Sequence, residues 1–282
     1  MNYNDVTIGI VTFKSEKVIF NCLKSIKNIK KIIIFDNSND IELKHKILKK
    51  YPKIQFIVSK KNLGYGGGNN QILKKSKTKY FFLLSPDTIL KKNCEQELIK
   101  QINKIKDFSL IAPFAKEKNF GFFQENKKTK NKNMLEVDYV KGFAMLFNTE
   151  KIKKFKMFDE NIFLYLEEID LCKRLRKQNH KIYVCKNAKI VHIGAKSSNL
   201  GFEYEKCRNW HWMWSKVYYD KKHFGNFYAF RNYFFQMIYD LLKLIIFSTT
   251  LNKKKTIITY LRLSGVFNSL IGNRSWYRPN TN

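Results

Sequence analysis

Three acids lie within four residues of one another in the segment YLEEIDLCKRLRK: Glu167, Glu168 and Asp170. A carboxylate there can act as a general base that accepts a proton from a substrate hydroxyl. A structural role is equally open, because acids at the start of a helix and bases near its end complement the helix dipole, and Asp170 and Arg174 form an i,i+4 pair. Neighbouring helical residues point about 100° apart, so Glu167 and Glu168 need not share one role.

Two further residues could hold a cation. Asp87 follows an apolar run in the segment LLSPDT, where Pro86 stiffens the chain, and His192 follows another in KIVHIGAKSS. Each has an ordinary explanation when taken separately. Pro-Asp is a favourable turn pair, and a lone histidine is more often a hydrogen-bonded residue than a ligand. The two residues gain weight only from the order in which they occur with the other features.

The glycine-rich segment NLGYGGGNNQ, at positions 62–71, follows an apolar run and precedes a helix-like segment. Backbone N–H groups at such a position can hold an anion. No Gly-Lys-Ser/Thr follows, which excludes a Walker A loop, and the spacing is not a GxGxxG. A dinucleotide-binding dehydrogenase carries its glycine loop after the first strand, whereas this cluster follows the third. A simple turn explains the cluster as well as a ligand loop does.

The elements that must position these residues alternate between strand and helix patterns. Apolar, β-branched runs predict strands at 6–13, 31–38, 53–59, 79–88 and 109–114. Helical spacing occurs at 15–29, 41–51, 67–77 and 93–106. This alternation predicts an α/β fold with a mostly parallel central sheet flanked by helices. Ligands bind at the carboxyl edge of such a sheet, where the predicted strand ends place Asp36, Asn37, Asn62 and Asp87.

The second half of the chain is less regular. Residues 117–134 are polar and predict an exposed loop, and residues 137–148 have the pattern of a strand. Residues 158–198 predict a loop, a helix, two short strands and a further loop. The remaining pattern is that of three helices rich in aromatic and basic residues. We therefore expect an α/β domain over residues 1–200 and a helical C-terminal region over residues 201–282.

The composition is strongly basic, with 54 Lys and Arg against 23 Asp and Glu and a formal net charge of +31. This charge suits nucleic acid, an anionic membrane face or phosphorylated substrates. Part of it accompanies a joint abundance of Lys, Asn and Ile that is typical of a biased base composition. The charge is spread along the chain and no recognised nucleic-acid motif occurs, so nucleic acid is the weakest of the three.

The cysteines and the apolar segments indicate the cellular compartment in which the protein acts. The five cysteines are Cys22, Cys94, Cys172, Cys185 and Cys207. Their odd number and wide spacing predict neither a disulfide framework nor a zinc site, and favour a reducing, cytoplasmic compartment. The N-terminal residues lack the pattern of a signal peptide. The most apolar stretch, residues 237–251, is interrupted by Asp240 and Lys243 and is shorter than a membrane span requires.

Seven segments occur in an order that resembles glycosyltransferase family 2, particularly its bacterial rhamnosyltransferase-like branch. They are TIGIVTF, IFDNS, NLGYGGGNN, LLSPDT, VKGFAMLFN, FDENIFLYLEEIDLCKRL and VHIGAKS. They extend from residue 6 to about residue 198. The resemblance implies a GT-A fold, which is that of nucleotide-diphospho-sugar transferases, with a helical C-terminal extension.

The resemblance also implies a nucleotide-sugar pocket. Thr12 and Phe13 resemble the edge of that pocket, and Asp36 resembles the acid that reads the base or ribose. The family's NxGxxxGxN loop beside the nucleotide-sugar is matched by Asn62, Gly64, Gly68 and Asn70. The donor implied is a dTDP-, UDP- or GDP-sugar, with rhamnose as the favoured sugar.

The remaining roles concern the metal and the base. Asp87 matches the last acid of the family's DxD-type motif, here reduced to Ser-Pro-Asp, and His192 matches a second metal ligand. These two imply Mn²⁺ or Mg²⁺, and the imidazole favours Mn²⁺. Glu168 matches the catalytic base, with Glu167 as the second candidate and Asp170 as a positioning residue. The reaction implied is an inverting transfer, in which the base deprotonates the acceptor while the cation stabilises the leaving diphosphate.

The acceptor implied is a saccharide or lipid-linked molecule in bacterial surface polysaccharide or lipooligosaccharide synthesis. We expect the C-terminal helices to pack on the catalytic domain, to form a homodimer or to contact the anionic inner face of the cytoplasmic membrane. The alternative hypothesis is a basic nucleic-acid-binding protein without catalytic activity. In the transferase interpretation no nucleic acid partner is expected.

Overall fold

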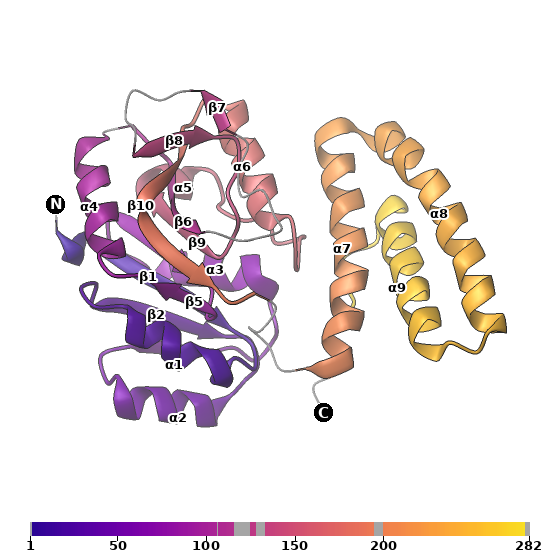
Figure 1. Ribbon diagram of the computed structural model, residues 1–282, viewed down its shortest axis with the longest axis horizontal. Coiled ribbons are helices and arrows are strands. Elements are labelled where there is room, and N and C mark those ends of the chain that lie inside the picture. The colour runs from indigo at the N-terminus through magenta and orange to yellow at the C-terminus, as the bar shows by residue number, and fades with distance from the viewer. Residues whose placement is uncertain (1, 106, 116–124, 128–132, 195–199, 280–282) are drawn as a thin grey trace. The chain divides into compact units, whose positions relative to one another are not determined.

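The computed structural model describes residues 2–105, 107–115, 125–127, 133–194 and 200–279. The chain forms two compact units (Figure 1). The first, an α/β unit, comprises Met1–Asp159 and Glu167–Ser198. The second, a helical unit, comprises Glu160–Leu166 and Asn199–Asn282. The short segment Glu160–Leu166 thus belongs to the helical unit, although both of its sequence neighbours belong to the α/β unit.

The first half of the α/β unit has the predicted alternation. After a short 3-10 turn at Tyr3–Asp5, its strands are β1 (Val6–Thr12), β2 (Lys31–Asp36), β3 (Gln55–Val58) and β4 (Tyr80–Leu84). The helices between them are α1 (Glu16–Ser25), α2 (Ile41–Lys50) and α3 (Gly64–Lys75). The four strands are parallel and lie in the order β3-β2-β1-β4. Their carboxyl ends therefore share one edge of the sheet.

The second half extends this sheet with strands of both directions. Its elements are β5 (Thr88–Leu90), α4 (Cys94–Lys104), β6 (Leu110–Ala115), β7 (Glu125–Lys127), β8 (Met134–Val137), β9 (Ala144–Asn148), α5 (Thr149–Lys154), α6 (Glu167–Lys177) and β10 (Ile182–His192). Strand β9 is antiparallel between β4 and β6, and β10 is parallel to β6. The sheet is mixed, but β1 to β4, β6 and β10 all run in one direction. The predicted α/β fold with a mostly parallel sheet is confirmed.

Two strand predictions need correction. Residues 137–148 do not form one strand, because β8 ends at Val137 and β9 begins only at Ala144. The carbonyl of Phe143 between them accepts hydrogen bonds from Ser85 N and Thr88 Oγ1, which ties this loop to the end of β4.

The two short strands expected before residue 192 are the single strand β10, with a register shift between Cys185 and Lys189. Sequence patterns also missed β5, β7 and α5. Most of the loop expected over residues 117–134 lies outside the described residues.

The sheet is covered on both faces. Successive residues of β4 alternate between two apolar layers, since Phe82 packs with Ile19 of α1 and Phe81 packs with Ile72 of α3. All five residues of β4 are buried. Burial on both faces explains why this strand reads as a continuous apolar run rather than as an alternation.

The helical unit consists of α7 (Gly201–Phe224), α8 (Asn226–Thr249) and α9 (Lys253–Leu270), as predicted. Trp210 and Trp214 of α7 pack with Leu261 of α9. Gly265 allows the α7 and α9 backbones to approach closely, because a Cβ there would lie 2.5 Å from the Trp210 carbonyl oxygen. No helix in the described part of the chain combines the length and the apolarity that crossing a bilayer requires.

Candidate active site

Asp87 and His192 meet at the carboxyl edge of the sheet, although 104 residues separate them in the sequence. Strand β5 pairs antiparallel with the end of β10, with Thr88 opposite His192. This pairing places His192 Nε2 3.4 Å from Asp87 Oδ1. Ser85 Oγ donates a hydrogen bond to the same carboxylate oxygen at 2.6 Å. The His192 ring stacks on Phe143, with their centroids 4.4 Å apart.

The environment of Asp87 favours its charged form. Burial alone would raise the pKa of this carboxyl group, but the hydrogen bond and charge of His192 and the hydrogen bond from Ser85 outweigh burial and lower it. An ionised carboxylate beside an imidazole nitrogen is a donor pair that suits Mn²⁺. Within the described ranges, no group of three or more His, Cys, Asp and Glu side chains is arranged to hold a metal ion.

Glu167 and Glu168 occupy the first turn of α6, where free backbone N–H groups favour negative charge. Glu167 is buried, and its Oε2 atom has no hydrogen-bond partner among the described residues. Burial and then the charge of Glu168 raise the pKa of Glu167 well above its usual range. Burial also raises the pKa of Glu168, although the charge of Lys141 acts in the opposite direction. Both carboxyl groups are therefore harder to ionise than free glutamic acid side chains, and the charge of Lys141 partly offsets this effect for Glu168.

The turn before α6 is unusual. Tyr165 and Leu166 both have left-handed backbone conformations, with φ of 69° and 68°. Such conformations are unfavourable for residues with bulky side chains and persist only where the surroundings impose them. The preceding residues are held within the helical unit, where Ser215 Oγ donates to the Leu164 carbonyl and Arg278 lies over the Phe163 ring. In the sequence this turn leads directly into α6, whose first residues are Glu167 and Glu168.

Tyr65 connects the two groups of titratable residues. Its hydroxyl donates to the Gly142 carbonyl. Burial raises the pKa of Tyr65 well above its usual range, and the charges of Glu167, Glu168 and Asp87 raise it further. Gly142 lies beside both Tyr65 and Glu168, and the next residue, Phe143, stacks on His192, so the acids of α6 lie near the acid that follows β4.

Gly142 completes the packing around Glu168. A Cβ at Gly142 would lie 3.6 Å from both Tyr65 Cε1 and Glu168 Cβ, so a methyl group would have ordinary contacts there. Sequence reasoning did not identify Tyr65 or Lys141 as site residues. Tyr65 lies within the glycine cluster and Lys141 within VKGFAMLFN, so the signals were the same two segments that carried the family resemblance.

The glycine cluster is part of a helix rather than a loop before one, because α3 already begins at Gly64. The glycines permit close packing at this helix start. A Cβ at Gly68 would lie 2.9 Å from Val11 Cγ1 of β1, and one at Gly66 would lie 3.0 Å from Phe158 Cβ. Among these glycines only Gly64 needs a left-handed backbone, with φ of 75°. The glycine cluster thus allows the N-terminus of α3 to pack closely against β1 and against Phe158.

Asp36, predicted to read the nucleotide, is fully buried and well satisfied within the chain. Its Oδ1 accepts hydrogen bonds from Thr12 Oγ1 and Ser38 Oγ, and its Oδ2 accepts from the backbone N–H groups of Ser38 and Asp40. Asp36 thereby joins the end of β1 to the turn after β2, and Thr12 is its buried partner. Half-buried Phe13 follows in the loop after β1.

Asn62 and the neighbouring Asn37 organise the start of α3. Asn62 Oδ1 accepts a hydrogen bond from Gly64 N. Asn37 at the end of β2 accepts from Leu63 N and donates to the Gly64 carbonyl, each at 2.9 Å. These bonds hold the left-handed turn that begins the helix.

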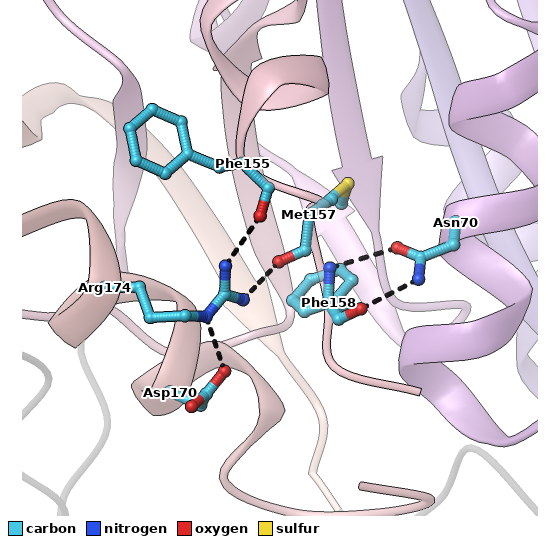
Figure 2. Close-up of polar contacts among 6 residues, drawn as sticks. All are labelled: Asn70, Phe155, Met157, Phe158, Asp170 and Arg174. Carbon is cyan, nitrogen blue, oxygen red and sulfur yellow. Dashed lines mark hydrogen bonds and ion pairs between the residues drawn. The ribbon is translucent and has the colours of Figure 1, made fainter. Parts of the chain in front are cut away.

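Asn70 and Asp170 are brought together indirectly, through the chain segment 155–158. Figure 2 shows that Asn70 accepts from Phe158 N and donates to the Phe158 carbonyl, at 3.1 and 2.9 Å. Arg174 donates to Asp170 Oδ2 and to the carbonyls of Phe155 and Met157 (Figure 2). Side chains of α3 and α6 therefore hold the same loop from opposite sides. Their contacts position the start of α6.

Comparison with known proteins places this geometry in a family. The model of glycosyl transferase family 2 matches residues 7–164, which is more than half of the chain. The chain belongs to glycosyl transferase family 2. The matched region includes Tyr65, Asp87 and Lys141, while Glu167, Glu168 and His192 lie just beyond it.

Individual relatives of this family 2 glycosyltransferase are distant. The low-salt glycan biosynthesis hexosyltransferase Agl10 of Haloferax volcanii is 27% identical over 67% of this chain and 67% of its own length. The rhamnosyltransferase WbbL of Escherichia coli is 27% identical over 64% of this chain and 78% of its own length. The mannosyltransferase PcManGT of Pyrobaculum calidifontis, solved with GDP-Man and Mn²⁺, has a TM-score of 0.60 at 9% identity, covering 94% of this chain and 87% of that one. The structural likeness confirms a GT-A-like fold.

Proposed function

We propose that this family 2 transferase is an inverting, metal-dependent enzyme that moves a hexose or rhamnose from a nucleotide-diphosphate donor. The acceptor is a saccharide or a lipid-linked saccharide of bacterial surface polysaccharide or lipooligosaccharide synthesis, handled at the inner face of the cytoplasmic membrane. The observation that carries the proposal is that Gly142 and Phe143 bring Tyr65 and Glu168 close to the pair of Asp87 and His192. In this proposal nucleic acid is not a partner, and the basic charge serves anionic substrates and surfaces.

The proposed chemistry begins with the Glu168 carboxylate, which accepts the proton of the acceptor hydroxyl. The acceptor oxygen then forms a bond to the anomeric carbon while the bond from that carbon to the diphosphate oxygen breaks, so the configuration inverts. Burial and the charge of Glu168 raise the pKa of Glu167, which disfavours the ionisation of both acids at once. Lys141 helps to keep Glu168 ionised because its charge lowers the pKa of that group.

Asp87 and His192 are the residues that would hold a divalent cation, Mn²⁺ or Mg²⁺. When bound, the cation supplies positive charge against the leaving diphosphate. The lowered pKa of Asp87 supports this role because the carboxylate is then ionised at neutral pH. The Mn²⁺ in the PcManGT structure supports Mn²⁺ as the first ion to test.

The donor sugar is proposed from the relatives. The names of the two curated relatives indicate a hexosyltransferase and a rhamnosyltransferase, and that of the structural relative a mannosyltransferase with GDP-Man. A dTDP-rhamnose donor is our first choice, with UDP- and GDP-sugars as alternatives.

A thermal-shift panel tests the proposed function. The purified protein is melted with dTDP-, UDP- and GDP-sugars, each with Mn²⁺ or with EDTA. We expect one nucleotide class to raise the melting temperature with Mn²⁺ and much less with EDTA, since a ligand that binds only the folded state stabilises it. The variant Asp87→Asn should lose the Mn²⁺-dependent part of this shift. If no nucleotide-sugar stabilises the protein with the metal, the proposed function is wrong.

A further inference from the structure

The outer face of α8 is a broad apolar surface within the helical unit. Phe227 and Phe235 are 78% and 74% exposed. The α8 side chains that are more than half exposed are Phe227, Phe230, Phe235, Tyr239, Leu241, Leu242, Ile245 and Ile246. At about 100° per residue they fall within an arc of roughly 180° on one side of the helix. So large a contiguous apolar surface marks an interaction site rather than ordinary solvent exposure.

The opposite side of α8 is already occupied. Ala229 and Tyr233 pack in the core that α8 shares with α7 and α9, and Tyr233 donates a hydrogen bond to Asp220 of α7. Asp240 is buried on the same side, 3.8 Å from Arg262 Nε of α9. Only one face of α8 is therefore available to a partner, so a partner must lie along the helix rather than surround it.

The charges of α8 and of the chain after it are almost all positive. Arg231 and Lys243 are the cations of α8, and its single acid, Asp240, points inward. No acidic residue follows Asp240 in the sequence. The cations that do follow it are Lys243, Lys253, Lys254, Lys255, Arg262, Arg274 and Arg278.

Three of the cations lie over aromatic rings of α8. Lys243 Nζ is 4.1 Å from the centroid of the Tyr239 ring, and Lys255 Nζ is 5.3 Å from that of Phe247. Arg231 lies over Tyr228. Long basic side chains of this kind keep the charged group in water while their stems cover apolar surface. By the helical spacing Lys243 lies beside the apolar face, whereas Arg231 falls within it. Aromatic rings and cations along an apolar stripe are typical of helices that lie in a membrane interface.

We propose that α8 lies in the plane of an anionic lipid bilayer, with its outer face inserted among the acyl chains and the surrounding cations on the lipid phosphates. The charge pattern selects this partner over a second copy of the chain. Two copies with a net charge of +31 each would bring like charges together, with no exposed acid on α8 to offset them. The inference rests on the helical unit alone and adds to the proposed function a surface that keeps the enzyme beside a lipid-linked acceptor.

Vesicle co-sedimentation of the full-length protein tests the proposal. The vesicles contain either phosphatidylcholine alone or phosphatidylcholine with phosphatidylglycerol. We expect strong binding to the anionic vesicles, weak binding to the neutral ones, and weaker binding as salt rises. Equal binding to both, or no binding to either at low salt, would overturn the proposal.

A matched pair of variants locates the surface. The double variant Phe235→Gln with Ile245→Gln should lower the affinity for anionic vesicles about tenfold or more, because it removes inserted apolar area. Ile41→Gln, which changes an exposed isoleucine on α2, should bind like the unchanged protein. Unchanged melting temperatures for both variants would show that they fold.

Light scattering addresses the competing occupant. Suppose that the unchanged protein is a dimer, that the double variant is a monomer, and that the two bind vesicles equally. A second copy of the chain then covers the outer face of α8, and the proposal is wrong. The thermal shift with nucleotide-sugars should be the same for the double variant and the unchanged protein. The nucleotide-sugar shift reports on the transferase function and vesicle binding reports on the membrane surface, so the two proposals can fail independently.

Discussion

The acid at the end of β2 and the acids at the start of α6 differ in how their oxygens are satisfied. Asp36 is fully buried, and it accepts four hydrogen bonds from its own chain. Glu167 is also buried, yet one of its oxygens has no partner in the described part of the chain and its pKa is raised. A satisfied carboxylate stabilises the backbone around it, whereas a buried acid with an unpaired oxygen and a raised pKa beside a second acid is typical of a functional site.

The largest stability effect should come from the satisfied acid. Asp36→Asn replaces one accepting oxygen with an NH₂ group that faces two donors. We expect a loss of roughly 3 kcal/mol in the free energy of unfolding, because two hydrogen bonds to a charged group are replaced by unfavourable contacts. Urea denaturation followed by circular dichroism measures this loss. If Asp36→Asn is as stable as the unchanged protein but its melting temperature rises less with nucleotide-sugar, Asp36 contacts the nucleotide, as the family resemblance implied.

Two glycines provide the next comparison. Gly68→Ala should cost about 1 to 3 kcal/mol, because its Cβ would lie 2.9 Å from Val11 Cγ1 in a tightly packed helix start. Gly142→Ala beside Glu168 should cost much less, since its Cβ has contacts of 3.6 Å. Melting temperatures of the two variants, measured side by side, check the difference. Equal costs would mean that the α3 start is less tightly packed than the distances indicate.

The smallest effect should have the opposite sign. Glu167→Gln keeps the shape of the protonated acid, and the glutamine side chain does not ionise. The folded-state pKa of Glu167 is raised, so its stabilising contribution is full below the usual Glu range and is lost as pH rises through the raised pKa. Above that pKa the variant should be more stable than the unchanged protein by roughly 1 kcal/mol.

Denaturation curves at several pH values test this prediction. The unchanged protein should lose stability from the usual Glu range up to the raised pKa, and the variant should show a flatter dependence over the same interval. A variant that is less stable at every pH would show that Glu167 is satisfied by contacts in the folded protein. The contrast between Asp36 and Glu167 would then not hold.

Much of the α/β unit could be predicted from the sequence, because buried parallel strands such as β1 and β4 read as continuous apolar runs. The place of Asp87 at the carboxyl edge of the sheet followed from the same reasoning, whereas the pairing of Asp87 with His192 followed only from the family resemblance. The antiparallel insertion of β9 and the continuity of β10 could not be predicted, since they depend on pairing between strands distant in the sequence.

The sequence could not separate structural from chemical polar residues. Asp36 and Asn70 match the family segments as well as Asp87 does, and only their hydrogen bonds distinguish them. Tyr65 was missed for a related reason. A tyrosine among glycines carries no periodic signal, and its place between Gly142 and the acids arises from the packing of α3 against the loop before β9.

The most direct test of the account is the transfer rate of Glu168→Gln, measured with the donor that the thermal-shift panel identifies and compared with Glu150→Gln on the exposed surface of α5. The account predicts that Glu168→Gln lowers kcat by about 10² to 10⁴ while the donor-induced shift in melting temperature is retained. Glu150→Gln should leave both unchanged. A Glu168→Gln variant that transfers sugar at the unchanged rate would contradict the assignment of the base and, with it, the role given to the paired acids of α6.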